Sequence, residues 1–186
     1  VTEAGVDVLH DQAAKPGEQN PNYDDDSYPD GVDDNDLNQT ITRTIVVTPP
    51  AGHGEAKTIT QTAKINRDAK VHVVSGQVDY GNWSTDATNW SDFKPAAIDG
   101  FTVSQSDVPA VEVNDGQKNQ TINITYTAND QTMNVIFQDG NGNEVARKTV
   151  SGKTDQTKVT NAQLPTGWVL SQGQSVPENV TFTGAH

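Results

Sequence analysis

The chain has 186 residues, of which 32% are hydrophobic and none is cysteine, and its formal net charge is −13. The hydrophobic share is well below the roughly 45–50% of an average globular protein, which favours small cores over one large core. The negative charge excludes nonspecific nucleic-acid binding and opposes binding to anionic membranes. The lack of cysteine excludes disulfide bonds and thiolate metal sites. No apolar run approaches the roughly 18 residues of a membrane-inserting helix.

The first 38 residues carry most of the negative charge, with eleven acidic residues and one basic residue. Residues 1–10 begin with alternating side chains that predict a short strand, with Val6 and Val8 on one face. From 11 to 38 the segment is rich in Asp and Pro and nearly free of aliphatic residues, so it cannot offset its chain entropy by burial. We therefore predict an acidic linker over 11–38.

The acidic linker also offers carboxylate ligands for a Ca²⁺ ion. The candidate ligands are Asp24, Asp26, Asp30, Asp33, Asp34 and Asp36. Their spacing does not fit the EF-hand loop, and no Glu stands at its twelfth position. A solvated linker without calcium is the alternative interpretation.

Alternation with period two dominates the rest of the chain. Apolar or inward residues alternate with Thr, Asn or Lys over residues 41–47, 59–65, 71–73, 122–126 and 133–137. This pattern is typical of half-buried antiparallel strands. Residues 139–143, with the sequence Asp-Gly-Asn-Gly-Asn, predict a hairpin turn. Short helices are predicted only over 86–93 and 154–163, so the fold class is mainly β (α+β).

A change of strand pattern near residues 128–130 divides the chain. The first strand set ends at Ala128, and a new alternating run starts at Thr132. We predict an N-terminal segment (1–38), a first domain (39–128) and a second domain (129–186), which together form an elongated molecule. A domain of about 60 residues is marginally stable without disulfides or metal.

The densest aromatic cluster is the candidate binding site of the sequence. It comprises Tyr80, Trp83, Trp90 and Phe93. Trp and Tyr side chains stack on sugar faces and dominate protein interfaces, but in a polar domain they also form the core. The histidines are far apart and lack metal-ligand spacing, and no catalytic motif is present, so an enzyme is not expected.

Two sets of residues form a recognisable pattern. In the first domain they are 37–45, 60–67, Tyr80, Trp83, Phe93, Pro95, Gly100, Phe101, Val108, Pro109 and Tyr126. In the second domain they are 135–142 and 167–170. Together they resemble the mucus-binding repeats of lactobacillus surface adhesins. Trp168 stands where the family more often has Tyr, a difference expected to matter little if the ring is in the core. The matches favour the core for Tyr80, Trp83 and Phe93 and leave Trp90 as the better surface candidate.

The resemblance implies two small β-grasp or ubiquitin-like modules in tandem, without catalytic residues or a required cofactor. It implies a long parent protein of neighbouring repeats, located outside the cell and anchored to the cell wall. Its partners would be mucin glycoproteins or their glycans, and some repeats of this type also bind immunoglobulins. A structural spacer without a ligand site is the alternative function.

The resemblance also suggests a role for residues 1–10. In a tandem repeat, the segment before them would look like the end of this chain, so they would be the closing strand of a ubiquitin-like module. We expect them to pair with residues 129–186 of the same chain or, by strand exchange, of a neighbouring chain. The alternative is that they pack on the first domain.

Overall fold

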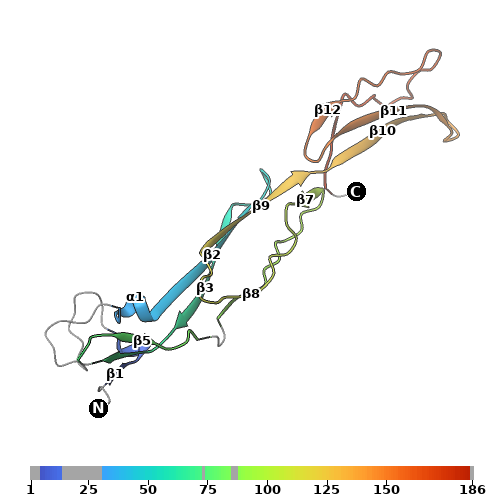
Figure 1. Cartoon of the computed structure of the whole chain (residues 1–186). Helices are drawn as coiled ribbons and strands as arrows, with labels where there is room; N and C mark the ends of the chain where they lie inside the picture. Colours follow the sequence, from blue (N-terminus) through green and yellow to red (C-terminus); the bar gives the residue numbers. More distant parts are fainter. Residues whose placement is uncertain (1–4, 14–30, 73, 85–87, 185–186) are drawn as a thin grey trace. The chain divides into compact units, whose positions relative to one another are not determined.

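The computed structural model describes residues 5–13, 31–72, 74–84 and 88–184, which are mainly β-strands (Figure 1). The strands are β1 (Gly5–Val8), β2 (Asn38–Thr48), β3 (Lys57–Asn66), β4 (Ala69–His72), β5 (Val78–Tyr80), β6 (Asn89–Trp90), β7 (Phe101–Val103), β8 (Val111–Glu112), β9 (Gln120–Ala128), β10 (Asp130–Gln138), β11 (Glu144–Lys153), β12 (Thr157–Val159) and β13 (Asn179–Thr181). Helical structure in these residues consists of α1 (Asp34–Leu37) and one 3-10 turn (His10–Gln12). The predicted fold class is confirmed.

The strands form several small sheets. A four-stranded sheet has the order β3-β2-β9-β7, and a three-stranded sheet has the order β1-β4-β5. The pairs β6–β8, β10–β11 and β12–β13 form two-stranded sheets. In β2, the residues predicted to point inward are the buried ones, from Ile41 to Val47, while the intervening Thr residues are more exposed.

By its contacts the chain divides into two compact units. The first unit comprises residues 1–46, 57–94 and 107–123, and the second comprises 47–56, 95–106 and 124–186. Each unit combines segments that are distant in the sequence, and the dividing line crosses β2 and β9. Whether residues 39–128 and 129–186 each fold as independent modules stays a prediction.

The N-terminal strand corrects one prediction. β1 pairs antiparallel with β4, with Val6 opposite Val71 and Val8 opposite Ala69, and not with residues 129–186. Val8 lies in one core cluster of the first unit together with Ala69 and Val71. Within this chain, the described part of residues 1–10 therefore does not pair with the second module, and strand exchange with a neighbouring chain stays a prediction. The observed pairing agrees with the alternative prediction, in which residues 1–10 pack on the first domain: β1 covers an edge of β4 and buries Val8.

The acidic linker prediction is wrong over residues 31–38. Val32 and Leu37 are fully buried in the same core cluster as Val8. Leu37 ends α1, whose first turn has a capping box: Asp33 Oδ1 accepts from Asp36 N at 3.0 Å, and Asp36 Oδ2 accepts from Asp33 N at 3.1 Å. Two isolated apolar residues are sufficient to anchor this segment on the core, because the short capped helix presents one of them, Leu37, directly to the sheet.

The predicted calcium ligands Asp24, Asp26 and Asp30 lie outside the described residues. Two further candidates, Asp33 and Asp36, use carboxylate oxygens in the capping box of α1. Within the part of the chain that the structure describes, no group of three or more metal-ligating side chains could hold an ion. Calcium binding by the acidic segment stays a prediction.

The two predicted helices are not present in the described residues of their ranges. Within 86–93, β6 pairs with β8 and places Trp90 opposite Val111. Within 154–163, β12 pairs with β13 through Thr157 and Thr181. In both places cross-strand pairing overrides a weak local preference for helix, since helix propensity is small compared with burial.

Candidate functional site

A hairpin forms one wall of a groove in the second unit. β10 and β11 pair antiparallel, with Phe137 opposite Ala146, and the register shifts between Phe137 and Gln138 (Figure 1). The predicted turn at 139–143 follows. Asp139 Oδ1 accepts from Asn141 N at 2.9 Å and from Asn143 N at 3.0 Å. These two backbone donors, Asn143 first, lower the pKa of Asp139 below its ordinary value and fix the carboxylate at the hairpin end.

The other wall is an irregular segment over residues 164–177. Two turns shape it, closed by Trp168 N to Pro165 O at 3.2 Å and by Gln174 N to Ser171 O at 3.1 Å. Thr160 Oγ1 donates to Pro177 O at 2.6 Å and holds the end of the segment. Between the turns stand three apolar residues that the fold leaves exposed: Trp168 (46%), Val169 (89%) and Leu170 (43%).

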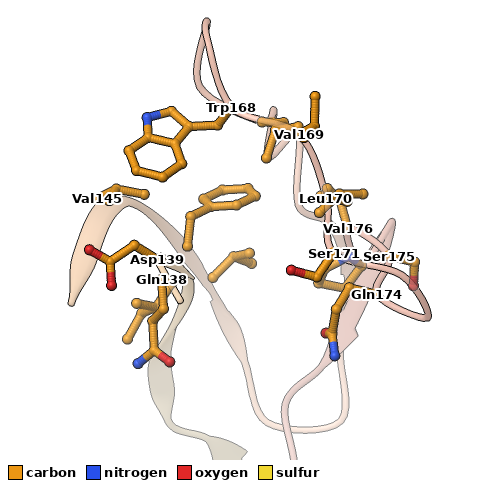
Figure 2. A pocket seen from close by; sticks show the side chains of 15 residues that line it. Gln138, Asp139, Val145, Trp168, Val169, Leu170, Ser171, Gln174, Ser175 and Val176 are labelled. Carbon is orange, nitrogen blue, oxygen red and sulfur yellow. The ribbon is translucent and has the colours of Figure 1, made fainter. Parts of the chain in front are cut away.

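The groove between these two walls has a volume of about 370 Å³. Figure 2 shows Gln138, Asp139 and Val145 on one side and Leu170, Ser171 and Gln174 on the other, with the Trp168 indole at one end. Amide and hydroxyl groups therefore border an apolar floor. An arrangement of this kind suits binding through ring stacking and hydrogen bonds.

The structure places the sequence-predicted Trp90 in the core of the first unit, so its choice as a surface candidate is wrong. Trp90 is 0% exposed, and its indole Nε1 donates to Ile41 O at 3.1 Å. It packs with Ala63, Ile65 and Val113. Pairing of β6 with β8 turns the ring inward, and no local sequence signal distinguishes this from an outward orientation.

Tyr80 and Trp83 are brought together in the first unit by Arg67. The Arg67 guanidinium lies 3.6 Å from the Tyr80 ring centroid and 4.5 Å from that of Trp83. Tyr80 is 42% exposed, which corrects its expected place in the core, and its hydroxyl donates to Gly31 O at 2.6 Å. Trp83 is half-buried against the core. Ligand binding by this pair stays a prediction.

The sequence analysis did not single out Trp168 as a candidate binding residue. The structure does not place its ring in the core, since Trp168 is 46% exposed. A signal was present: residues 168–170 are three consecutive apolar residues between turn-forming stretches at 165–167 and 171–173. A segment too short for a helix and lacking alternation cannot bury all three side chains.

The described groove thus has the character of a ligand-binding surface, and its lining residues provide no nucleophile–base pair. The chain belongs to the Muc B2-like domain family, whose family pattern matches residues 32–130. The match includes the buried Val32 and Leu37 and ends before the groove. Domains of this kind are adhesion domains and not enzymes, as the sequence predicted.

Several solved structures are similar to this chain. One is the mucin-binding domain of a Streptococcus pneumoniae protein, with 25% identity over 48% of this chain and 89% of that one and a TM-score of 0.42. Another is the type 2 repeat of the mucus binding protein MUB from Lactobacillus reuteri, with 19% identity, 67% and 59% coverage and a TM-score of 0.44. A third is the MucBP domain of an adhesion protein from Pediococcus pentosaceus, with 26% identity, 49% and 99% coverage and a TM-score of 0.36.

No curated protein matches the sequence. The chain spans 59% of the Lactobacillus repeat. Among the described residues, no helix is long and apolar enough to cross a membrane.

Proposed function

We propose that this chain is a repeat of an extracellular mucus-binding adhesin and that it attaches to mucin glycoproteins through the Trp168 groove. The observation that carries the proposal is an exposed indole at the end of a groove bordered by free amide and hydroxyl groups. Membership of the Muc B2-like family supports the adhesive role. The groove lies outside the matched residues, so its part in binding rests on its own chemistry.

The groove chemistry suits the sugars of a mucin. A pyranose ring presents a face of C–H groups that packs on an indole, and hydroxyls that exchange hydrogen bonds with amides. Large apolar side chains that cluster on an exposed surface are typical of interaction sites. Single exposed apolar side chains scattered over a surface are common and carry no such meaning. Trp168, Val169 and Leu170 form such a cluster beside Ser171 and Gln174.

The proposed mode of attachment is multivalent. A single groove of this size would bind weakly, and linkage of neighbouring repeats along a wall-anchored parent protein would raise the overall avidity. We therefore expect an array of four copies to be retained on mucin more strongly than one copy. Equal retention of one and four copies would contradict this part of the proposal.

Immunoglobulin binding is a second candidate partner interaction, and a specific strand edge favours it. β3, ten residues long, is the terminal strand in the order β3-β2-β9-β7. A terminal strand presents backbone donors and acceptors to an incoming strand, which is a recurrent mode of recognition. Mucin and immunoglobulin binding would then use different surfaces. A spacer with neither activity is the remaining alternative.

The test compares four proteins on surfaces coated with purified mucin or immunoglobulin: the unmodified chain, Trp168→Ala, Tyr80→Ala and Val159→Ala. Val159 is a matched control, because it is an exposed apolar residue of the second unit outside the groove. We expect Trp168→Ala to lose most mucin retention and the control to retain it. Loss with Tyr80→Ala alone would move the site to the first unit. No retention of the unmodified chain would favour the spacer.

A further inference from the structure

We propose that the Trp168 groove recognises uncharged saccharides and discriminates against sialylated or sulfated ones. This inference rests on the proposed function and adds the ligand class to it. Three features of the groove carry it: the absence of a cation among the lining residues, one fixed carboxylate, and side-chain amides on the two walls of the groove (Figure 2).

The first feature is the charge of the lining. Of the residues that line the groove, Asp139 is the one charged residue, and none is Lys, Arg or His. The nearest cations by strand register are on β11. Arg147 donates from Nε and from Nη2 to Glu144 Oε1, at 2.9 and 2.6 Å, and is not among the lining residues. Lys148 lies opposite Val135 in the register but is not among the lining residues. An anionic sugar would find no counter-charge within the groove.

The second feature is the permanence of the Asp139 charge. Both backbone donors of the hairpin turn point to its Oδ1 and lower the pKa of the carboxyl below its ordinary value. An Asp carboxyl at its ordinary pKa is already ionised at neutral pH, so Asp139 is charged there. A ligand carboxylate or sulfate placed in the same groove would be repelled. The net charge of −13 for the whole chain acts in the same direction at longer range, although salt screens that contribution.

The third feature is the set of neutral polar groups. The side-chain amides of Gln138 and Gln174 make no hydrogen bond to another residue in the described part of the chain, so they retain donors and acceptors for a ligand. A sugar hydroxyl is itself both donor and acceptor and is matched by an amide, whereas an ionised group only accepts. With the indole of Trp168 at the end of the groove, the site fits a neutral hexose or N-acetylhexosamine (Figure 2).

The decisive experiment uses paired probes that differ only in charge. N-acetyllactosamine and its sialylated form are titrated against the chain, with binding followed by tryptophan fluorescence. Trp168 is the most exposed of the three tryptophans described, since Trp83 is half-buried and Trp90 is fully buried. In parallel, retention is measured on mucin before and after sialidase treatment. We expect tighter binding of the neutral probe by about tenfold or more and higher retention on the treated mucin.

Variants of the groove provide the matched controls. Gln174→Lys adds a cation and should narrow or reverse the preference for the neutral probe over the sialylated one. Gln174→Met, of similar length, should weaken the binding of both probes alike. Asp139→Asn removes the charge while leaving one side-chain oxygen to accept both turn N–H groups, because the same Oδ1 accepts both in the hairpin. This variant should raise the affinity for the sialylated probe relative to that for the neutral probe.

The outcomes separate this inference from the proposed function. If retention depends on Trp168 but falls after sialidase treatment, or if the sialylated probe binds as well as the neutral one, the charge discrimination is overturned and the adhesin function stands. If retention is unaffected by Trp168→Ala, the groove is not the site and both proposals fail. If neither probe nor either mucin binds, both fail as well.

Discussion

The guanidinium of Arg43 lies 5.2 Å from the centroid of the Trp90 ring in the interior of the first unit. Arg43 is 1% exposed, and each of its three polar groups has a partner: Nε donates to Gln61 Oε1 at 2.7 Å, Nη1 to Pro109 O at 2.9 Å and Nη2 to Ser91 O at 2.9 Å. Burial lowers the pKa of Arg43. The charged side chain is stable in the core because its guanidinium donors bind acceptors in two loops and in a neighbouring strand.

We expect Arg43→Lys to destabilise the first unit by about 2–3 kcal/mol, because a single ammonium cannot reach three acceptors and leaves buried carbonyls without a donor. Urea unfolding followed by circular dichroism measures the change. Arg147→Lys is the matched control at an exposed ion pair, where a change within about 0.5 kcal/mol is expected. Equal decreases in the free energy of unfolding of the two variants would show that the buried hydrogen bonds of Arg43 contribute no more than an exposed ion pair.

Trp90→Phe is expected to lower stability by about 1–3 kcal/mol and to leave mucin retention unchanged. The substitution removes the Nε1 donor of Ile41 O and some buried volume. Trp168→Phe should behave in the opposite way, with little effect on unfolding and a weaker binding signal. A loss of binding by folded Trp90→Phe would restore Trp90 as a ligand residue.

The contact between His10 and Asp68 predicts a pH dependence of the N-terminal strand. His10 N and His10 Nδ1 both lie 2.9 Å from Asp68 Oδ1, and the ring bond, followed by the backbone bond, lowers the pKa of Asp68. Because the folded pKa is below the unfolded one, this contact stabilises the fold above the ordinary Asp value of about 4, and the stabilisation disappears as the pH falls through the lowered value.

Amide hydrogen exchange of β1, corrected for its intrinsic pH dependence, tests this prediction. Protection of Asp7 and Val8 should fall below about pH 4. Asp68→Asn should reduce the protection at neutral pH too, whereas Asp115→Asn, in an exposed turn of the same unit, serves as the control. Protection that does not change with pH or with Asp68→Asn would contradict the role of this contact.

Gly152 is expected to tolerate no side chain. A Cβ at this position would collide with the ring of Phe182, which is fully buried in the second unit. We therefore expect Gly152→Ala to cost about 1–3 kcal/mol through overpacking. Gly140→Ala is the matched control, since a Cβ there would meet nothing within 4 Å. The comparison uses thermal unfolding, and equal midpoints for the two variants would refute the packing argument.

The sequence by itself determined the fold class and several of the long strands, but not the short strands β6 and β12, whose ranges it predicted as helices. Alternation in β2 specified which residues face inward, including Arg43, because a period of two leaves one face to the core whatever the partner strand is. The run 139–143 likewise determined its hairpin turn, since Asp139 and its neighbours close the turn locally. Both signals depend only on contacts between residues close in the chain.

The tertiary structure alone decided the partners and the site. β1 pairs with β4, about sixty residues away, and Val32 and Leu37 join its core, although composition assigned them to a solvated linker. Trp90 is buried and Trp168 is exposed for the same reason. Pairing between segments that are distant in the sequence decides which aromatic rings are covered, and the local sequence pattern does not indicate that pairing. The candidate groove therefore emerged only when the irregular segment 164–177 was placed against the β10–β11 hairpin.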